Sequence, residues 1–273
     1  IDGGDGTDTL VGTTAELAAL TTASNVSNVE VIAVSNAHTT ALTSTNIGAG
    51  LAVNLAAGAN AGSVTYGAGS SSLTLGTANA GLLTVNDTGL ATDDSLSITL
   101  SSAANSLNGQ AVAINGMETV SINTGTATAK TVNTINVTGD VDGAGVRTAA
   151  TLDLSGAASL TTAGAITLGA ATGNGTINAS SMTGALVMGA AAVGVRTITG
   201  GAGADTILGD NQVSTLTGGA GNDQITGGTA VDTISGGAGN DTITGSTGAD
   251  VVDGGTGNDI FNYTDAQFAA TTT

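Results

Sequence analysis

The sequence has no cysteine and no proline, and its aromatic residues are only two tyrosines and two phenylalanines. Without cysteine, there are no disulfide bonds and no thiol nucleophile. Three basic residues face 21 acidic ones, for a formal net charge of −18 at pH 7. This balance excludes ordinary binding to the phosphate backbone of nucleic acids. No transmembrane helix is expected, because the uncharged segment 154–195 is rich in Gly, Thr, Ser and Asn.

Catalytic motifs are missing as well. The only histidine is His38, so a two-histidine zinc site of the HExxH type is impossible, and no Gly-x-Ser-x-Gly motif occurs. Asp93–Asp94 and Asp140 with Asp142 are paired carboxylates in loops rich in small polar residues. We interpret them as solvated turn residues or an accessory calcium site, not as a catalytic pair. We therefore expect that the protein is not an enzyme.

The abundant residues are small. Thr, Ala, Gly, Ser and Val dominate, and 44 of the 273 residues are glycine. Such a chain builds a thin core, which suits a stacked solenoid better than a thick globule. The sequence begins Ile1-Asp2 without an initiator Met, and we interpret it as a segment of a longer protein.

The segment 200–262 divides without a gap into seven nonamers, and the sixth residue is Asp in six of them. The eighth residue is always apolar: Ile207, Leu216, Ile225, Ile234, Ile243, Val252 and Phe261. A glycine-rich linker would not keep a carboxylate and an apolar residue in fixed phase over this length. The pattern therefore indicates a structural repeat.

This nonamer predicts a parallel β-roll. Its first six residues form a turn, in which glycine adopts unusual backbone angles without steric penalty, and its last three form a short strand. Two nonamers make one coil, and coils stack at the strand spacing of about 4.8 Å. The turns then form two columns. The first column begins its turns at Gly200, Gly218, Gly236 and Gly254, and the second column at Gly209, Gly227 and Gly245.

The negative charges of the repeat indicate that it binds a cation. Residues 200–262 contain eight Asp and no Lys or Arg. Carboxylates stacked about 5 Å apart repel each other by about 3 kcal/mol per pair at an effective dielectric constant of about 20. Oxygen ligands that include two carboxylates suit calcium. We expect this region to be disordered without calcium and to fold when calcium binds.

The repeat resembles the RTX (repeats-in-toxin) family, whose pattern is GGxGxDxUx. The resemblance implies that each ion takes the second, fourth and sixth residues of one turn and the first, third and sixth of the turn one coil later. The implied first-column ligands are Gly201, Gly203, Asp205, Gly218, Ala220 and Asp223; then Gly219, Gly221, Asp223, Gly236, Ala238 and Asp241; then Gly237, Gly239, Asp241, Gly254, Thr256 and Asp259.

The second column is poorer. The turn at Gly209 reads GDNQVS and lacks the sixth-position Asp, so a site between it and Gly227 is doubtful. The next pair of turns keeps its carboxylates. Its implied ligands are Gly228, Ala230, Asp232, Gly245, Thr247 and Asp250.

A lone nonamer, Gly3–Val11, lies near the start of the chain and carries Asp8 as a candidate calcium ligand. Alone it cannot form a cage of two turns. We expect it to stack either on turns upstream of this segment or on a neighbouring coil of this one. A short helical turn is predicted at Ala15–Leu20.

Short alternating segments between the lone nonamer and the roll predict strands. They are Val29–Val34, Leu51–Leu55, Ser72–Leu75, Leu82–Val85, Leu96–Leu100, Thr119–Ile122, Thr134–Val137, Thr151–Leu154, Ala165–Leu168 and Ala185–Val187. Their spacing fits an irregular β-solenoid or a β-sandwich. We favour the solenoid, because the last strands run into the roll without a linker and a continuous stack covers its own end.

The predicted fold is therefore all-β, a parallel β-roll preceded by an irregular solenoid-like region. We divide the chain into the lone nonamer with its entry (1–12), the solenoid-like region (13–199), the calcium-binding roll (200–262) and a tail (263–273).

Three further segments, Val26–Val34, Ile114–Ile122 and Ile177–Val187, resemble RTX-type surface-layer (S-layer) proteins of Gram-negative bacteria. We interpret Glu30 and Glu118 within them as solvated or strand-capping carboxylates rather than metal or sugar contacts. The resemblance implies type I secretion and extracellular assembly into a two-dimensional lattice through self-contacts bridged by calcium. It also implies anchoring to surface polysaccharide or lipopolysaccharide. Two alternatives are the stalk or terminal module of an RTX adhesin, and the C-terminal module of a secreted protease or lipase.

Overall fold

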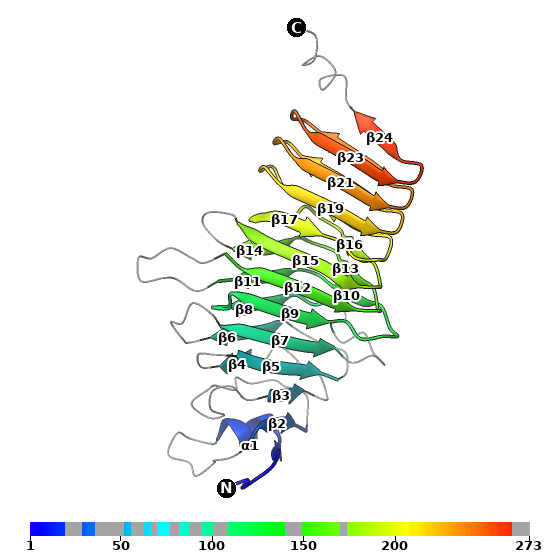
Figure 1. Ribbon diagram of the computed structural model, residues 1–273. Coiled ribbons are helices and arrows are strands. Elements are labelled where there is room, and N and C mark those ends of the chain that lie inside the picture. The colour runs from blue at the N-terminus through cyan, green and yellow to red at the C-terminus, as the bar shows by residue number, and fades with distance from the viewer. Residues whose placement is uncertain are drawn as a thin grey trace.

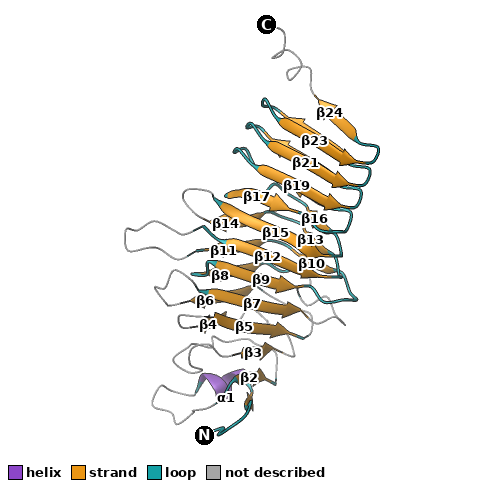
Figure 2. Ribbon diagram, viewed as in Figure 1, coloured by secondary structure: helices purple, strands orange, loops and turns teal. Residues whose placement is uncertain are grey.

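The computed structural model describes residues 1–19, 29–35, 52–55, 63–66, 70–76, 82–87, 94–100, 107, 109–139, 149–169 and 174–263. In these residues the chain winds as a stack of parallel strands, with one short helix near the N-terminus (Figures 1 and 2). The predicted all-β solenoid is confirmed. The β-sandwich alternative is wrong, since each strand pairs in parallel with the strand one coil away.

Three sheets form the sides of this stack. The long sheet contains, in order, β1 (Thr9–Gly12), β2 (Val31–Val34), β3 (Ala52–Leu55), β5 (Ser70–Leu75), β7 (Ser95–Leu100), β9 (Thr119–Asn123), β12 (Thr151–Gly156), β15 (Gly175–Met182), β17 (Val195–Thr199), β19 (Thr215–Ala220), β21 (Thr233–Ala238) and β23 (Val251–Thr256). The second sheet contains β10 (Lys130–Val132), β13 (Leu160–Thr162), β16 (Leu186–Met188), β18 (Thr206–Leu208), β20 (Gln224–Gly228), β22 (Thr242–Ser246) and β24 (Ile260–Tyr263). The third sheet contains β14 (Ile166–Gly169), β11 (Ile135–Thr138), β8 (Val112–Asn115), β6 (Leu83–Asp87) and β4 (Ser63–Tyr66).

The register shows two nonamers per coil in the roll. Ile207 pairs with Ile225 and Ile225 with Ile243, each 18 residues on. Strands of the long sheet are longer here than the predicted three residues, because pairing continues into the next turn, where Gly219 lies opposite Gly237. Gly219 has a φ of +113°, and a Cβ there would collide with the Gly201 carbonyl oxygen. Glycine thus lets the turns stack as closely as the strands.

Upstream coils are less regular. Thr9 pairs with Val31, 22 residues on, whereas Thr119 pairs with Thr151, 32 residues on. The chain nevertheless enters the roll without a break, because β17 pairs with both β15 and β19. The change at residue 200 is thus a change of sequence pattern within one continuous long sheet.

The core is a thin interior column of aliphatic side chains. Alternate residues of most strands are buried, β1 and β24 excepted, and they form one cluster that extends from Leu17 to Ile243. Tyr66 is the only aromatic residue in this cluster, and its hydroxyl donates a hydrogen bond to the Ser72 carbonyl oxygen at 2.8 Å. Small side chains therefore fill the interior, as the composition predicts.

All ten predicted upstream strands overlap observed strands. The predictions missed β4, β8, β10, β13, β15 and β17, several of which have only three or four residues. The helix α1 (Thr14–Ala18) begins before the predicted position because Thr13 caps it: the Thr13 hydroxyl accepts from the Glu16 N–H, and the Glu16 carboxylate accepts from the Thr13 N–H. His38, Asp93, Asp140 and Asp142 lie outside the described residues.

No helix in the described part of the chain has the length and hydropathy to cross a membrane.

Candidate metal centre

The sixth residue of each nonamer lies directly before a strand. In the first column, Asp205, Asp223, Asp241 and Asp259 precede the strands β18, β20, β22 and β24. In the second column, Ser214, Asp232 and Asp250 precede β19, β21 and β23. The parallel register therefore stacks these side chains in two files, one on each side of the roll.

One oxygen of each carboxylate is fixed by the neighbouring coil. The N–H of Asp205 donates to Asp223 Oδ1 at 2.7 Å, and the N–H of Asp223 donates to Asp241 Oδ1 at 2.8 Å. Asp241 and Asp259 repeat this bond at 3.0 Å. In the second column, Asp232 Oδ1 accepts from the Ser214 N–H at 2.8 Å. These bonds fix the orientation of each carboxylate.

The other oxygen has no partner in the protein at three positions. Oδ2 of Asp223, Asp232 and Asp241 is buried and makes no hydrogen bond, and these residues are at most 1% exposed. A buried, unsatisfied carboxylate oxygen is unfavourable, because it has lost water without gaining a donor or a cation. A bound cation would remove this penalty.

Each unsatisfied oxygen faces a carbonyl oxygen from the next coil. A Cβ placed on Gly218 would meet both Asp223 Oδ2 and the Gly236 carbonyl oxygen. The same pairing recurs at Gly236 and Gly227, where the carboxylates are Asp241 and Asp232 and the carbonyls are Gly254 and Gly245. At Gly200, Asp205 Oδ2 and the Gly218 carbonyl oxygen also converge, but this Oδ2 already accepts the Gly201 N–H at 2.7 Å. A carboxylate and a carbonyl oxygen that converge beside a glycine form the start of an oxygen cage suited to calcium.

The other predicted carbonyl ligands are less fully defined. The Gly201, Ala238 and Thr256 carbonyl oxygens each accept a backbone hydrogen bond between coils at 2.8 Å, which leaves each a second lone pair. The carbonyls of Gly203, Gly219, Gly221 and Ala230 face a glycine of the next coil, and the Gly228 carbonyl accepts from the Thr247 N–H at 3.2 Å. The assignment of individual ligands therefore stays a prediction.

Burial controls the electrostatics of these carboxyl groups. The pKa of Asp223 is raised to about 6, chiefly by burial, with the nearby carboxylates of Asp205 and Asp241 acting in the same direction. Burial also raises the pKa of Asp205 and of Asp232. Within the described ranges, no three Asp, Glu or His side chains gather around one point, so backbone oxygens have to complete any cage.

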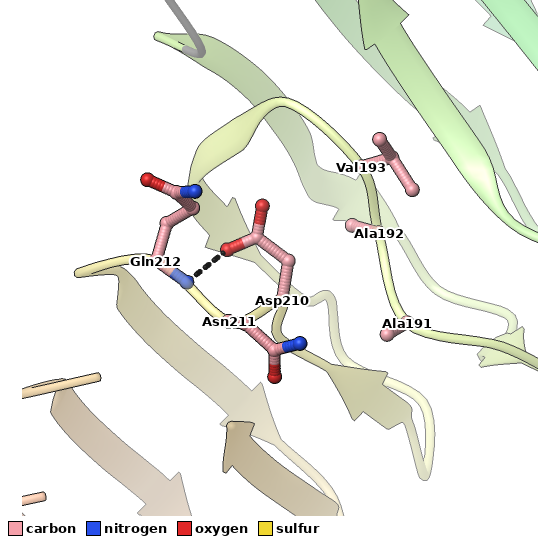
Figure 3. A pocket seen from close by; sticks show the side chains of 6 residues that line it. All are labelled: Ala191, Ala192, Val193, Asp210, Asn211 and Gln212. Atoms are coloured by element: carbon pink, nitrogen blue, oxygen red, sulfur yellow. Dashed lines mark hydrogen bonds between the residues drawn. The ribbon is translucent and has the colours of Figure 1, made fainter. Parts of the chain in front are cut away.

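The turn at Gly209 differs from the others, as its sequence predicts. The nearest atoms to a Cβ on Gly209 would belong to the Gly227 carbonyl group and to Leu216 Cδ1, with no carboxylate oxygen among them. Asp210 Oδ1 instead accepts from the Gln212 N–H at 2.8 Å (Figure 3). A hollow of about 280 Å³ lies here, lined by Asp210–Gln212 and by Ala191–Val193.

The lone nonamer stacks on a neighbouring coil of the same chain, since β1 pairs with β2. The Asp8 N–H donates to Glu30 Oε2 at 2.8 Å, and Asp8 Oδ2 is buried without a hydrogen bond. The same bond joins the Asp94 N–H to Glu118 Oε2 at 3.0 Å. Glu30 and Glu118 thus bind the backbone one coil earlier, as the roll aspartates do, and this fits a strand-capping role.

Sequence reasoning missed two features of the stack. It did not pair Glu30 with Asp8 or Glu118 with Asp94, although each Glu directly precedes a strand of the long sheet. It also missed an asparagine ladder at the fifth position of the first column. There the Asn240 N–H donates to Asn222 Oδ1, and the Asn258 N–H to Asn240 Oδ1, both at 2.8 Å. The signal for this ladder was the repeated Asn-Asp pair.

A family model described as the RTX calcium-binding nonapeptide repeat matches the chain in four copies, at residues 1–15, 199–234, 209–242 and 226–261. These matches cover the lone nonamer and the roll, where the carboxylates stack. No curated protein and no solved structure matches the chain.

Proposed function

We propose that this chain, which carries RTX calcium-binding nonapeptide repeats, is part of a secreted structural protein. In this proposal the protein folds when calcium binds and assembles into a bacterial surface layer. The protein has no catalytic role in this proposal. Its partners are further copies of itself, surface polysaccharide or lipopolysaccharide, and the type I secretion machinery.

The observation that carries the proposal is the set of buried carboxylate oxygens without partners at Asp223, Asp232 and Asp241. Residues 200–262 have no Lys or Arg to neutralise them. The repeats bind calcium, and calcium between the coils replaces like-charge repulsion with attraction. Ion binding then supplies the free energy that closes the roll.

Calcium dependence suits a protein that folds only after export. In the cytosol, calcium is too scarce to fill such sites, so the roll stays open and the chain can pass through a secretion channel. Outside the cell, calcium fills the columns and the roll closes. RTX repeats are typical of secreted proteins, which supports this order of events.

The continuous stack supports a structural role. The long sheet extends from β1 to β23, so the roll and the upstream coils form a single elongated body (Figure 1). A solenoid of this kind transmits order from coil to coil and presents long, regular sides for lateral contacts. A lattice subunit needs both properties.

Two measurements test the proposal. Far-UV circular dichroism in calcium and in EGTA should show that β structure is lost when calcium is removed. Electron microscopy of the purified protein in calcium should show a two-dimensional lattice. Isolated fibres or monomers would favour an adhesin module instead, and an unchanged β spectrum in EGTA would count against calcium-driven folding.

A further inference from the structure

Arg196 stands in the file of the second column, one coil before Ser214. Thr197 pairs with Thr215, so the residues directly before them, Arg196 and Ser214, occupy equivalent positions. The segment Ala191–Thr199 is a degenerate nonamer that the sequence analysis did not identify. Its fourth residue is Gly194, with a φ of +73°, its eighth residue Ile198 is buried, and its sixth residue is Arg196 instead of Asp.

The Arg196 guanidinium reaches across to the turn of the next coil. Nη2 donates to the Gln212 side-chain oxygen at 3.1 Å, and Nη1 donates to the Val213 carbonyl oxygen at 3.5 Å. Gln212 occupies the fourth position of its turn and Val213 the fifth. A cation attached to one turn therefore binds two oxygens of the following turn and links the two coils, through residues other than the first, third and sixth positions that a calcium ion would use.

The two turns around Arg196 lack the sixth-position carboxylates of the other sites; their one acidic residue is Asp210, at a second position, and its Oδ1 accepts from the Gln212 N–H. Neither sixth-position residue of these two turns is acidic, since one is Arg196 and the other Ser214. The Ser214 hydroxyl donates to the Gln212 carbonyl oxygen at 3.0 Å. The first carboxylate of the file, Asp232, lies one coil further on and accepts the Ser214 N–H.

We propose that Arg196 takes the place of calcium between the turns 191–196 and 209–214. The junction between the upstream solenoid and the roll is then held by the protein's own cation, and calcium loading of the second column begins between Gly227 and Gly245. In the absence of calcium, the upstream coils and this junction stay folded. The calcium-dependent coils then fold onto them when calcium binds. This proposal uses the calcium binding of the repeats but not the surface-layer role.

Hydrogen–deuterium exchange of the full chain, read by mass spectrometry, tests the proposal. Peptides that cover 209–217 and 227–235 are compared in calcium and in EGTA. On removal of calcium, 209–217 should lose about tenfold less protection than 227–235, because hydrogen bonds to a charged donor remain. R196Q should abolish this difference, whereas R147Q, which removes the same charge elsewhere, should keep it. Equal loss in both wild-type peptides, or an R196Q protein that behaves as wild type, overturns the proposal.

Counting bound calcium provides a second readout if R196Q does not fold. S214D places a carboxylate one coil before Asp232 and should add one bound calcium ion to the full chain. In this variant Arg196 still prevents calcium from binding between the turns 191–196 and 209–214. R196D combined with S214D should add one more ion than S214D alone. Equal ion counts in S214D and in the double variant contradict the role of Arg196 as the substitute cation.

Discussion

At the scale of single residues, the two oxygens of a sixth-position aspartate such as Asp223 have different roles. Oδ1 of Asp223 accepts a backbone N–H from the previous coil, so it orients the side chain. Oδ2 is buried without a partner and faces a carbonyl from the next coil. One residue thus takes part both in the hydrogen bonds between coils and in the proposed calcium sites. A substitution that keeps the hydrogen bond but removes the calcium ligand can distinguish the two roles.

Asp223→Asn tests the proposed calcium sites. Asn keeps an oxygen for the Asp205 N–H but removes the charge, and Asp223 is a proposed ligand of two consecutive ions. We expect calcium affinity at these sites to fall by at least about tenfold, as for the loss of a buried charge partner. Isothermal titration calorimetry measures the change. Asp253→Asn, at an exposed residue outside the files, serves as the control, and equal affinities in the two variants would contradict the assignment.

The raised pKa values predict how pH acts without calcium. The Asp223 carboxyl has a pKa of about 6 in the folded state, above its ordinary value, so the fold favours its protonated form. This contribution to stability is present below about pH 4 and is lost as pH rises through about 6. In EGTA, the fraction of β structure that remains by far-UV circular dichroism should therefore be greater at pH 5 than at pH 7. More remaining β structure at pH 7 than at pH 5 would contradict the prediction.

The same titration acts with opposite sign on calcium binding. Protons and calcium compete for the carboxylate oxygens, so calcium affinity should fall as pH drops below about 6. Calorimetric titrations at several pH values separate the two effects, because acid stabilises the calcium-free roll while it weakens the calcium-bound one.

At the scale of the element, the glycine turn and the aliphatic strand act together in most nonamers. The turn brings a carboxylate and a carbonyl oxygen together beside its first glycine. The strand buries one aliphatic side chain, such as Ile225, against the same residue type on adjacent coils. The turn therefore carries the ion chemistry and the strand carries the core.

Gly218→Ala should disable one cage. The new Cβ would enter the space that Asp223 Oδ2 and the Gly236 carbonyl oxygen share, so it would both block an ion and force the coils apart. We expect the free energy of unfolding, measured in calcium, to fall by about 1–3 kcal/mol. The variant should also bind at least one calcium ion fewer than the wild type. Thr256→Ala is the matched control, because Ala220 and Ala238 already hold Ala at that position of the nonamer. Near-identical calcium counts for both variants would argue against the cage.

Ile225→Ala tests the strand. Ile225 is 1% exposed, and its truncation should lower the free energy of unfolding in calcium by about 2–5 kcal/mol through lost burial and a cavity. Ile260→Ala removes the same atoms from a residue that is 58% exposed and should change stability by less than about 0.5 kcal/mol. Urea unfolding of the two variants gives the comparison, and equal losses would show that the roll core does not carry stability.

At the scale of the whole molecule, the pairing of coils could be predicted from the sequence in the roll, but less well in the upstream coils. The nonamer fixes both the coil length and the sixth-position files, because an invariant period dictates which residues stack. Upstream, the coil length varies between pairs such as Thr9–Val31 and Thr119–Thr151, so the sequence could indicate strands but not which residues pair. The bonds of Glu30 to Asp8 and of Glu118 to Asp94 depend on that pairing, and so does the position of Arg196 beside the turn at Gly209.

The most direct test of the account is a crystal structure of the protein grown with calcium, with an anomalous difference map. We predict four ions: between Asp205 and Asp223, between Asp223 and Asp241, between Asp241 and Asp259, and between Asp232 and Asp250. The position between Arg196 and Ser214 should show no ion peak. A map without peaks along the first column, with these carboxylates turned to solvent, would contradict calcium binding between the coils.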